Sequence, residues 1–249
     1  MAVIWQRDDG EVHYEVRSHG ATLRLYANGV QHSEFHPRRL VTGSVWDLLW
    51  LPALLHDPAQ YRRVLVLGLG GGSLVPPLRA LVAPEQLVAV ERDPLHLQVA
   101  EEVFCIGGSD VELHCADAVE WVRRWQGPPF DLVIEDLFAP VDTSVTRAVE
   151  ASRSWFRELT GLLSPQGTLV MNFGDSAEFR ASAVSGRSLR KGWQAGFGFT
   201  TPDCHNLVAS WLRTPGDSGA LRQRLRAHPE LARSLHRRRL EYRVRRLFG

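Results

Sequence analysis

The segment over residues 64–73, Val-Leu-Val-Leu-Gly-Leu-Gly-Gly-Gly-Ser, constrains the fold of this chain more than any other. An apolar, strand-forming run leads directly into the glycines, and residues 73–83 then predict a helix. A strand, a glycine turn and a helix together open a nucleotide-binding βαβ unit. Glycines let the backbone turn tightly and approach a ligand that a Cβ atom would exclude. The segment therefore predicts a nucleotide-binding turn.

A carboxylate stands at the end of the next predicted strand. Glu91 closes the run Val-Ala-Val-Glu and lies 23 residues after Gly68. A ribose-binding acid is expected about 20 residues after such glycines, and a carboxylate accepts two parallel hydrogen bonds from ribose hydroxyls. The pair predicts an adenosine-containing ligand. The alternative is an acid that only favours a helix N-terminus through the helix dipole.

Strand and helix patterns alternate through the middle of the chain. The predicted strands cover residues 64–67, 87–90, 111–114, 131–134 and 168–173, and the predicted helices cover residues 73–83, 94–104, 117–126 and 144–163. Such alternation implies an α/β fold, with a mostly parallel sheet and helices on both faces. Residues 199–213 predict a final pair of strands.

Three regions divide the chain. Residues 1–41 predict a β-meander of about three strands, with Asn28-Gly29 as a hairpin turn. Residues 42–215 form the Rossmann-like, nucleoside-binding catalytic domain. Residues 216–249 predict a basic helical tail, with ten arginines against three acids in a chain whose net charge is +1. We interpret the tail as an amphipathic helix packed on the body or on a partner subunit; contact with nucleic acid or an anionic membrane is the alternative.

Composition excludes several classes of protein. The chain is 44% hydrophobic and 23% charged, as ordinary globular proteins are. It has no apolar run near the ~20 residues of a membrane span and no secretory signal pattern. Its three cysteines form no Cys-x-x-Cys pair, which favours free thiols in the cytoplasm. We expect no metal and no membrane or nucleic-acid partner; a zinc site built from His114, Cys115, Cys204 and His205 is the alternative.

Two further acids follow the third and fourth strands of the α/β region. Asp117 is placed to accept a hydrogen bond from an adenine amino group, or alternatively to cap the helix over 117–126. Asp136 lies where a reacting group would sit, because ligands of open α/β sheets bind at the carboxyl ends of the strands. A nicotinamide dehydrogenase has no particular need of these two acids. The chain lacks the Gly-Lys-Ser/Thr of a P-loop and the Gly-x-Ser-x-Gly of a hydrolase.

These motifs resemble those of the spermidine synthases (polyamine aminopropyltransferases) within the class I S-adenosylmethionine-dependent methyltransferase superfamily. The resemblance covers residues 23–211, and its motifs lie at residues 25–31, 64–74, 90–93, 113–118, 130–140 and 163–169. It implies a Rossmann-like fold with a mostly parallel seven-stranded sheet, and a transferase of polyamine biosynthesis. It also implies a homodimer that pairs through the N-terminal hairpins.

The resemblance assigns roles to individual residues. The implied nucleoside site consists of Gly68, Gly70, Gly72, Glu91, Arg92, Asp117, Ala118 and Asp136. Asp136 falls on the family's catalytic aspartate, which implies a base that also orients the attacking amine. The implied co-substrate is decarboxylated S-adenosylmethionine or S-adenosylmethionine, and the acceptor is a small amine or another nucleophile.

The departures from the family pattern cluster on the acceptor side. The acid within the family's glycine turn falls at Gly71, and the second acid of its Asp-x-x-Asp-Pro motif falls at Ala139. The residues left to contact an acceptor are Gln31, Trp46, Asp47 and His205. After Asp136, the loop with Pro140, Asp142 and Thr143 has the composition of a mobile loop.

Three functions remain open on this basis. The first is an aminopropyltransferase that uses decarboxylated S-adenosylmethionine. The second is a methyltransferase on the same scaffold; Gly71 favours it, because an acid at that position would repel the carboxylate of intact S-adenosylmethionine. The third is a non-catalytic nucleoside-binding protein.

Overall fold

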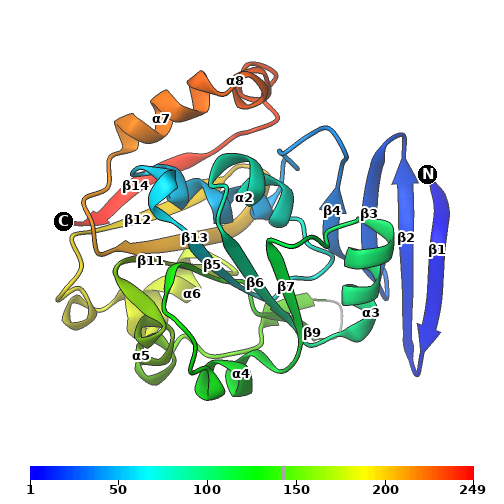
Figure 1. Ribbon diagram of the computed structural model, residues 1–249, viewed down its shortest axis with the longest axis horizontal. Helices are drawn as coiled ribbons and strands as arrows, with labels where there is room; N and C mark the ends of the chain where they lie inside the picture. Colours follow the sequence, from blue (N-terminus) through cyan, green and yellow to red (C-terminus); the bar gives the residue numbers. More distant parts are fainter. Residues whose placement is uncertain (142–143) are drawn as a thin grey trace.

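The computed structural model describes residues 1–141 and 144–249, and an eight-stranded sheet forms its centre (Figure 1). The strand order is β14-β12-β13-β11-β8-β5-β6-β7. The parallel strands are β5 (Arg63–Leu67), β6 (Gln86–Glu91), β7 (Val111–Cys115), β8 (Phe130–Glu135) and β11 (Leu163–Phe173). β13 (Cys204–Leu212) pairs antiparallel with both β11 and β12 (Ala195–Thr201). The predicted α/β fold with a mostly parallel sheet is confirmed.

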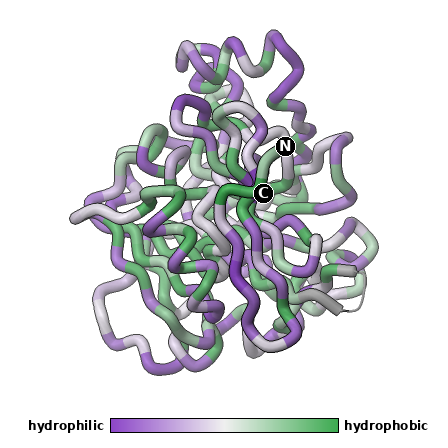
Figure 2. The backbone as a smooth tube through the Cα atoms, turned by 90° about the vertical axis from the view of Figure 1, so that its right-hand side faces the viewer, coloured by the Kyte–Doolittle hydropathy of each residue, from purple (hydrophilic) through white to green (hydrophobic). Residues whose placement is uncertain are grey.

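The central strands are apolar because both faces of the sheet are covered. Along β5, Val64 and Val66 pack into one core cluster, while Leu65 and Leu67 pack into the other. Successive strand side chains point to opposite faces, so an unbroken apolar run fits a strand buried on both sides. Hydrophobic residues accordingly follow the inner strands, whereas the helices at the top of the view are mainly hydrophilic (Figure 2).

Separate helices cover the two faces. One face carries α1 (Val45–Trp50) and α2 (Val75–Leu81), and the other carries α4 (Ala118–Arg124), α5 (Arg153–Gly161) and α6 (Ser176–Ala181). α3 (Pro94–Gln98) continues into a π-helical turn over Val99–Val103, and short 3₁₀ turns occupy Leu51–Leu54, Pro58–Gln60, Ala183–Ser185 and Arg187–Leu189. None of the helices in the described ranges is long and apolar enough to cross a bilayer.

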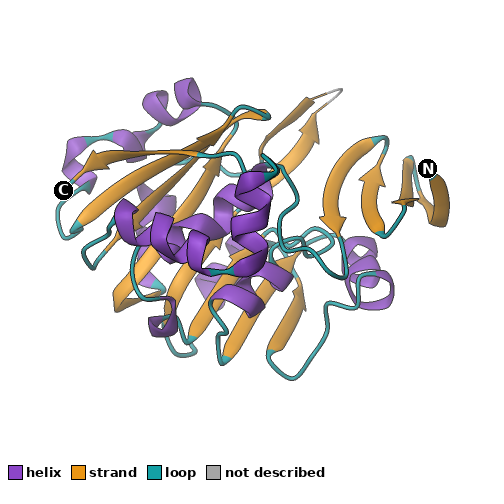
Figure 3. Cartoon of the chain, turned by 90° about the horizontal axis from the view of Figure 1, so that it is seen from above, coloured by secondary structure: helices purple, strands orange, loops and turns teal. Residues whose placement is uncertain are grey.

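The N-terminal region is a four-stranded antiparallel sheet at one end of the molecule (Figure 3). Its strands are β1 (Ala2–Asp9), β2 (Val12–His19), β3 (Thr22–Ala27) and β4 (Val30–Phe35). Asn28 and Gly29 adopt positive φ and join β3 to β4 in a two-residue hairpin, as predicted. The sequence does not reveal β1, because this edge strand is exposed on both faces and lacks an alternating pattern.

The predicted helix over residues 144–163 is wrong in its first half. Ser144–Arg147 is strand β10, which pairs antiparallel with β9 (Phe138–Val141). The helix begins only after Ser152, whose hydroxyl accepts a hydrogen bond from the Trp155 amide and caps α5. Asp142 and Thr143 of the predicted mobile loop lie outside the described residues.

The prediction of a helical tail is likewise wrong for its last residues. α7 (Ser218–Ala227) and α8 (Pro229–His236) form, but β14 (Arg243–Phe248) then pairs antiparallel with β12 and adds an eighth strand. Glycine in β12 makes room for this strand, since a Cβ atom on Gly196 would lie 2.1 Å from the Phe248 ring. Tertiary pairing therefore overrides the helical spacing of the apolar residues.

Candidate active site

The glycine turn follows β5 and lies against the end of β8. The Asp136 amide donates a hydrogen bond to the Leu67 carbonyl, 2.8 Å away, which brings the two strand ends together. Gly68 has a φ of +84°, and a Cβ atom there would lie 2.2 Å from the Asp136 carbonyl oxygen. Glycine is therefore required at this position. The structure thus places the predicted nucleotide turn beside the predicted catalytic aspartate.

Strand β4 of the N-terminal sheet closes over the glycine turn. The Gly71 amide donates a hydrogen bond of 2.6 Å to the Ser33 hydroxyl, and the Glu34 amide donates one of 2.9 Å to the Ser73 hydroxyl. A Cβ atom on Gly71 would lie 2.8 Å from the Phe104 ring and 3.1 Å from the Ser33 Cβ atom. The space that the family's acid would need is therefore already filled by packed side chains.

Glu91 is fixed beside this turn by backbone amides. Its Oε2 accepts a hydrogen bond from the Gly70 amide at 2.7 Å, and its Oε1 accepts one from the Asp93 amide at 2.9 Å. The side chain is 13% exposed. Each carboxylate oxygen has two lone pairs, so acceptor capacity remains for two hydroxyl groups. The structure therefore joins the predicted glycines and the predicted ribose acid in one site.

A histidine pair lies next to Glu91. The rings of His32 and His96 lie 4.7 Å apart, and the His96 Nδ1 lies 3.9 Å from the Glu91 Oε1. Burial lowers the pKa of His32 to about 4, so this ring is neutral at pH 7. The sequence reading selected Gln31, whose amide oxygen lies 3.5 Å from the Tyr26 hydroxyl instead. The pairing of β3 with β4 is irregular at this point, with His32 as an extra residue, so strict strand alternation does not predict its position.

Asp117 serves as the cap of α4. Its Oδ1 accepts hydrogen bonds from the amides of Val119 and Glu120, at 2.9 and 3.0 Å. Ala118 is buried in the core behind it, and Arg92 lies exposed after β6. The capping alternative is therefore seen in the structure. Because both bonds use the same oxygen, the cap leaves the Oδ2 for another donor.

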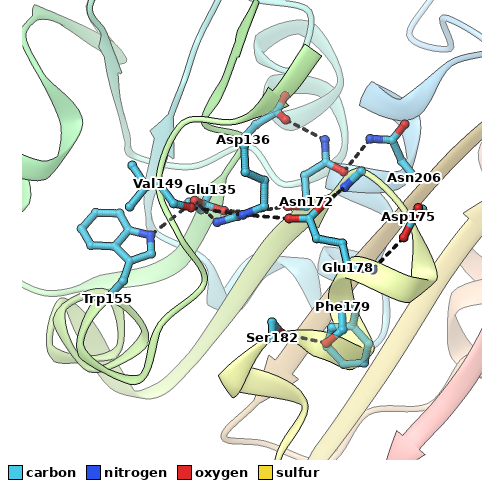
Figure 4. Close-up of polar contacts among 12 residues, drawn as sticks. Glu135, Asp136, Val149, Trp155, Asn172, Asp175, Glu178, Phe179, Ser182 and Asn206 are labelled. Carbon is cyan, nitrogen blue, oxygen red and sulfur yellow. Dashed lines mark hydrogen bonds and ion pairs between the residues drawn. The ribbon is translucent and has the colours of Figure 1, made fainter. Parts of the chain in front are cut away.

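Glu135 and Asp136 are neighbours in sequence with opposite surroundings (Figure 4). Glu135 is fully buried and accepts hydrogen bonds of 2.6 and 2.9 Å from Arg147 and one of 3.3 Å from the Trp155 indole. Its burial raises its pKa, and the Arg147 charge opposes that rise. Glu135 and Arg147 therefore form an internal ion pair that holds the base of the β9–β10 hairpin.

Asp136, by contrast, is held by an amide. Its Oδ1 accepts a hydrogen bond of 2.7 Å from the Asn172 side chain, whose own oxygen accepts one of 3.1 Å from Asn206 (Figure 4). Burial raises the pKa of Asp136 to about 6, against the opposing effect of Asn172. Among the described residues no cation lies within ion-pair distance of it. A carboxylate in this state can bind an ammonium group and exchange a proton near neutral pH.

Sequence reasoning missed both asparagines. Asn172 is a polar residue in an otherwise apolar strand, at the strand end where ligands bind, and this pattern could have identified it. Asn206 follows His205, which was selected instead. His205 is exposed, and it makes no hydrogen bond or ion pair to Asp136 in the described structure.

Two further acceptor-side candidates lie on α1. Asp47 is 3% exposed and accepts hydrogen bonds from the Thr42 amide and hydroxyl, both at 3.0 Å, and from the Gly43 amide at 2.7 Å. Burial raises its pKa to about 6. Trp46 is partly buried against the core. The structure therefore uses Asp47 to hold the turn before α1, and no described polar contact joins it to Asp136.

The chain is similar to known proteins of two activities. It is 29% identical over 181 residues to the polyamine aminopropyltransferase of Vibrio vulnificus, covering 71% of this chain and 59% of the relative. It is 29% identical over 133 residues to the human eEF1A lysine and N-terminal methyltransferase, covering 48% of this chain and 19% of the relative. The chain thus spans less than two thirds of either relative, and both are transferases by name.

A solved structure has the same architecture over nearly the whole chain. A probable spermidine synthase from Corynebacterium glutamicum superposes with a TM-score of 0.74 at 16% identity, covering 99% of this chain and 91% of that one. No family model matches the chain. The strand order and the glycine turn define a class I methyltransferase fold with an added N-terminal sheet. Within that class, the chain is spermidine synthase-like in both sequence and structure.

Proposed function

We propose that this protein is a transferase that binds decarboxylated S-adenosylmethionine and moves its aminopropyl group to an amine. The observation that carries the proposal is the Asp136 carboxylate, which has a pKa of about 6 and lies against the glycine turn. The similarity to a polyamine aminopropyltransferase supports the reaction class. Asp136 would then bind the acceptor amine directly beside the sulfonium group of the donor.

The donor's nucleoside fits the polar groups around the glycine turn. Glu91 would accept hydrogen bonds from the two ribose hydroxyls while its backbone partners keep it in place. Asp117 would accept one from the adenine amino group through Oδ2, because Oδ1 caps α4. These side chains orient the donor, and orientation supplies much of the catalysis when the electrophile is already activated.

Asp136 would hold and deprotonate the acceptor. Alkylammonium groups have a pKa of roughly 10, so the acceptor arrives protonated and cannot attack in that form. The ionised carboxylate attracts the ammonium, orients it and helps to remove one proton. The amine nitrogen then bonds to the aminopropyl carbon next to sulfur. The carbon–sulfur bond breaks, and its electron pair leaves with neutral methylthioadenosine.

A methyltransferase that uses intact S-adenosylmethionine is the second candidate, because of the surroundings of Gly71. Phe104 and Ser33 fill the space of an acid at this position, so no carboxylate from the turn would repel the carboxylate of the intact donor. The similarity to an eEF1A lysine methyltransferase supports this candidate. Asp136 would play the same role toward an amine acceptor in either reaction.

Calorimetric titration with decarboxylated and with intact S-adenosylmethionine tests the two candidates. Aminopropyl transfer predicts tighter binding of the decarboxylated form and release of methylthioadenosine when amines are added. Equal or tighter binding of the intact form would overturn it in favour of methyl transfer. The Glu91→Gln variant should weaken either complex by about 10- to 100-fold, the worth of one or two hydrogen bonds to a charged group.

Glu85→Gln is the matched control for this titration. Glu85 precedes the opposite end of β6 and forms an exposed ion pair with Arg62. It has the same chemistry as Glu91 but no contact with the glycine turn, so its variant should bind like the wild type. Failure of both donors to bind would reject the transferase proposal as a whole.

A further inference from the structure

A cavity of about 160 Å³ is lined by residues of the loop after β4, of helix α8 and of the turn that follows it, all far along the chain from Asp136. Its lining consists almost wholly of cationic side chains: Arg38, Arg39, Arg233, Arg237 and Arg239, with Glu230 and Ser234. Five arginines against one glutamate give this small space a strongly positive potential. A concave surface lined by charge of one sign concentrates counter-ions.

No close ion pair within the described residues neutralises these arginines. Within the described ranges, none of the five guanidinium groups lies within 4.0 Å of a carboxylate oxygen. Glu230 lines the cavity, and its Oε1 accepts a hydrogen bond of 2.6 Å from the Leu40 amide. That bond ties α8 to the loop across the cavity. The cavity is therefore held in shape while its positive charge is left unpaired.

Arg39 shows the cost of this arrangement. Its Nη2 donates a hydrogen bond of 2.6 Å to the Thr22 hydroxyl, but its Nε is buried without a partner in the described structure. Burial lowers the pKa of Arg39, and the charge of Arg239 lowers it further. A buried donor of a charged group that lacks an acceptor is destabilising. An anion in the cavity would supply the missing acceptor and the missing negative charge.

The turn after α8 places its three consecutive arginines in different surroundings. Arg238 adopts a left-handed conformation with φ of +55°, and the Arg239 amide returns to donate to the Ser234 carbonyl at 2.9 Å. Arg238 pairs with Glu241 at 2.8 Å. Its neighbours on either side, Arg237 and Arg239, line the cavity. The chain reversal therefore brings the two unpaired arginines on either side of Arg238 to the same cavity.

We propose that this cavity binds a compact phosphoryl anion, either inorganic phosphate or the phosphate of a small ester. The planar guanidinium group matches phosphate oxygens with two parallel hydrogen bonds, and arginine is preferred wherever such recognition occurs. Several guanidinium groups around a space of about 160 Å³ suit a small, multiply charged ion better than an extended polymer such as a nucleic acid. The site is separate from the proposed transfer site and does not depend on the reaction.

Titration of the full-length protein at constant ionic strength tests this proposal, with inorganic phosphate, glycerol phosphate and a single-stranded oligonucleotide as probes. The Arg233→Gln/Arg237→Gln double variant removes two exposed cavity arginines. The Arg222→Gln/Arg226→Gln variant is its matched control, because it removes the same charge from exposed positions of α7 outside the cavity. Thermal unfolding without phosphate checks that both variants fold.

We expect saturable binding of phosphate that weakens at least about tenfold in the cavity variant and is unchanged in the control. Tighter binding of glycerol phosphate than of phosphate would identify an ester as the ligand, and equal binding would identify the free ion. Absence of saturable phosphate binding would overturn the proposal. Equal weakening in both variants would also overturn it, as would oligonucleotide affinity that grows with length and resists competition by phosphate.

Discussion

The two halves of the candidate active site are built differently. In the nucleoside half, backbone amides of the glycine turn and of Asp93 hold Glu91 in place. In the acceptor half, Gly71 and Ala139 stand where the resemblance to spermidine synthases implies acids, and Asp47 is engaged by its own turn. In the proposed function, donor binding would therefore rest on side chains fixed by the backbone of the fold, whereas acceptor choice would rest on side chains that differ from the family pattern. The two properties can therefore be separated by mutation.

Replacement of Asp136 by asparagine should have the largest effect, because it should sharply reduce turnover without changing donor binding. The amide keeps the size of the side chain but cannot hold an ammonium group or accept its proton. We expect turnover to fall by about 10²- to 10⁴-fold, the usual worth of a general base, with nucleoside affinity unchanged. Release of methylthioadenosine or of S-adenosylhomocysteine, alongside calorimetry with the donor, measures both.

Asp175→Asn provides the control for that variant. Asp175 follows the neighbouring strand β11 and caps α6, and asparagine caps helices equally well. Its turnover should match the wild type. Near-normal turnover in Asp136→Asn would remove Asp136 from the mechanism, and loss of donor binding would show that the two halves are not separable.

Substitution at Gly71 tests, through the stability of the protein, whether the space beside the glycine turn is filled. Because a Cβ atom would lie 2.8 Å from the Phe104 ring, Gly71→Ala overpacks a filled space and should lower the free energy of unfolding by about 1–3 kcal/mol. Gly161→Ala is the control, since a Cβ atom there meets nothing within 4 Å at the end of α5. Denaturant unfolding measures both, and wild-type stability of Gly71→Ala would refute the packing explanation.

The smallest effect is expected at Asn172 and concerns pH. In the proposed mechanism Asp136 acts when it is ionised, so activity should rise as the pH passes through about 6 and then level off. Asn172 donates to the ionised carboxylate, and Asn172→Ala should raise the pKa of Asp136 and move this limb to higher pH. The plateau rate should change by the worth of one hydrogen bond, about 0.5–1.5 kcal/mol. Rate profiles from pH 5 to 9 measure the shift, and an unmoved limb would mean that another group controls it.

The raised pKa of Asp136 also makes the stability of the fold depend on pH. The folded protein holds the Asp136 proton more tightly than the unfolded chain, whose aspartate has a pKa near 3.8. This carboxyl therefore stabilises the fold at low pH, and its contribution is lost as the pH rises from about 4 through 6.

The sequence predicted those parts of the site that come from local patterns. The glycine turn, Glu91 and Asp136 each follow an apolar strand, and consecutive parallel strands bring their carboxyl ends together whatever the rest of the chain does. Ser33 and His32 reach the same turn from the separate N-terminal sheet, and this contact depends on how two sheets pack. β14 was missed for a related reason: its apolar residues fit helical spacing, and only the glycines of β12 reveal a partner strand.

The packing of Phe104 over Gly71 also bears on how such a site can evolve. The two positions are 33 residues apart in the chain yet share one space, so the tolerance of each depends on the other. An acid could enter the glycine turn only once a smaller residue had replaced the aromatic ring. Substitutions at the two positions are therefore coupled, and the order in which they can be accepted is constrained.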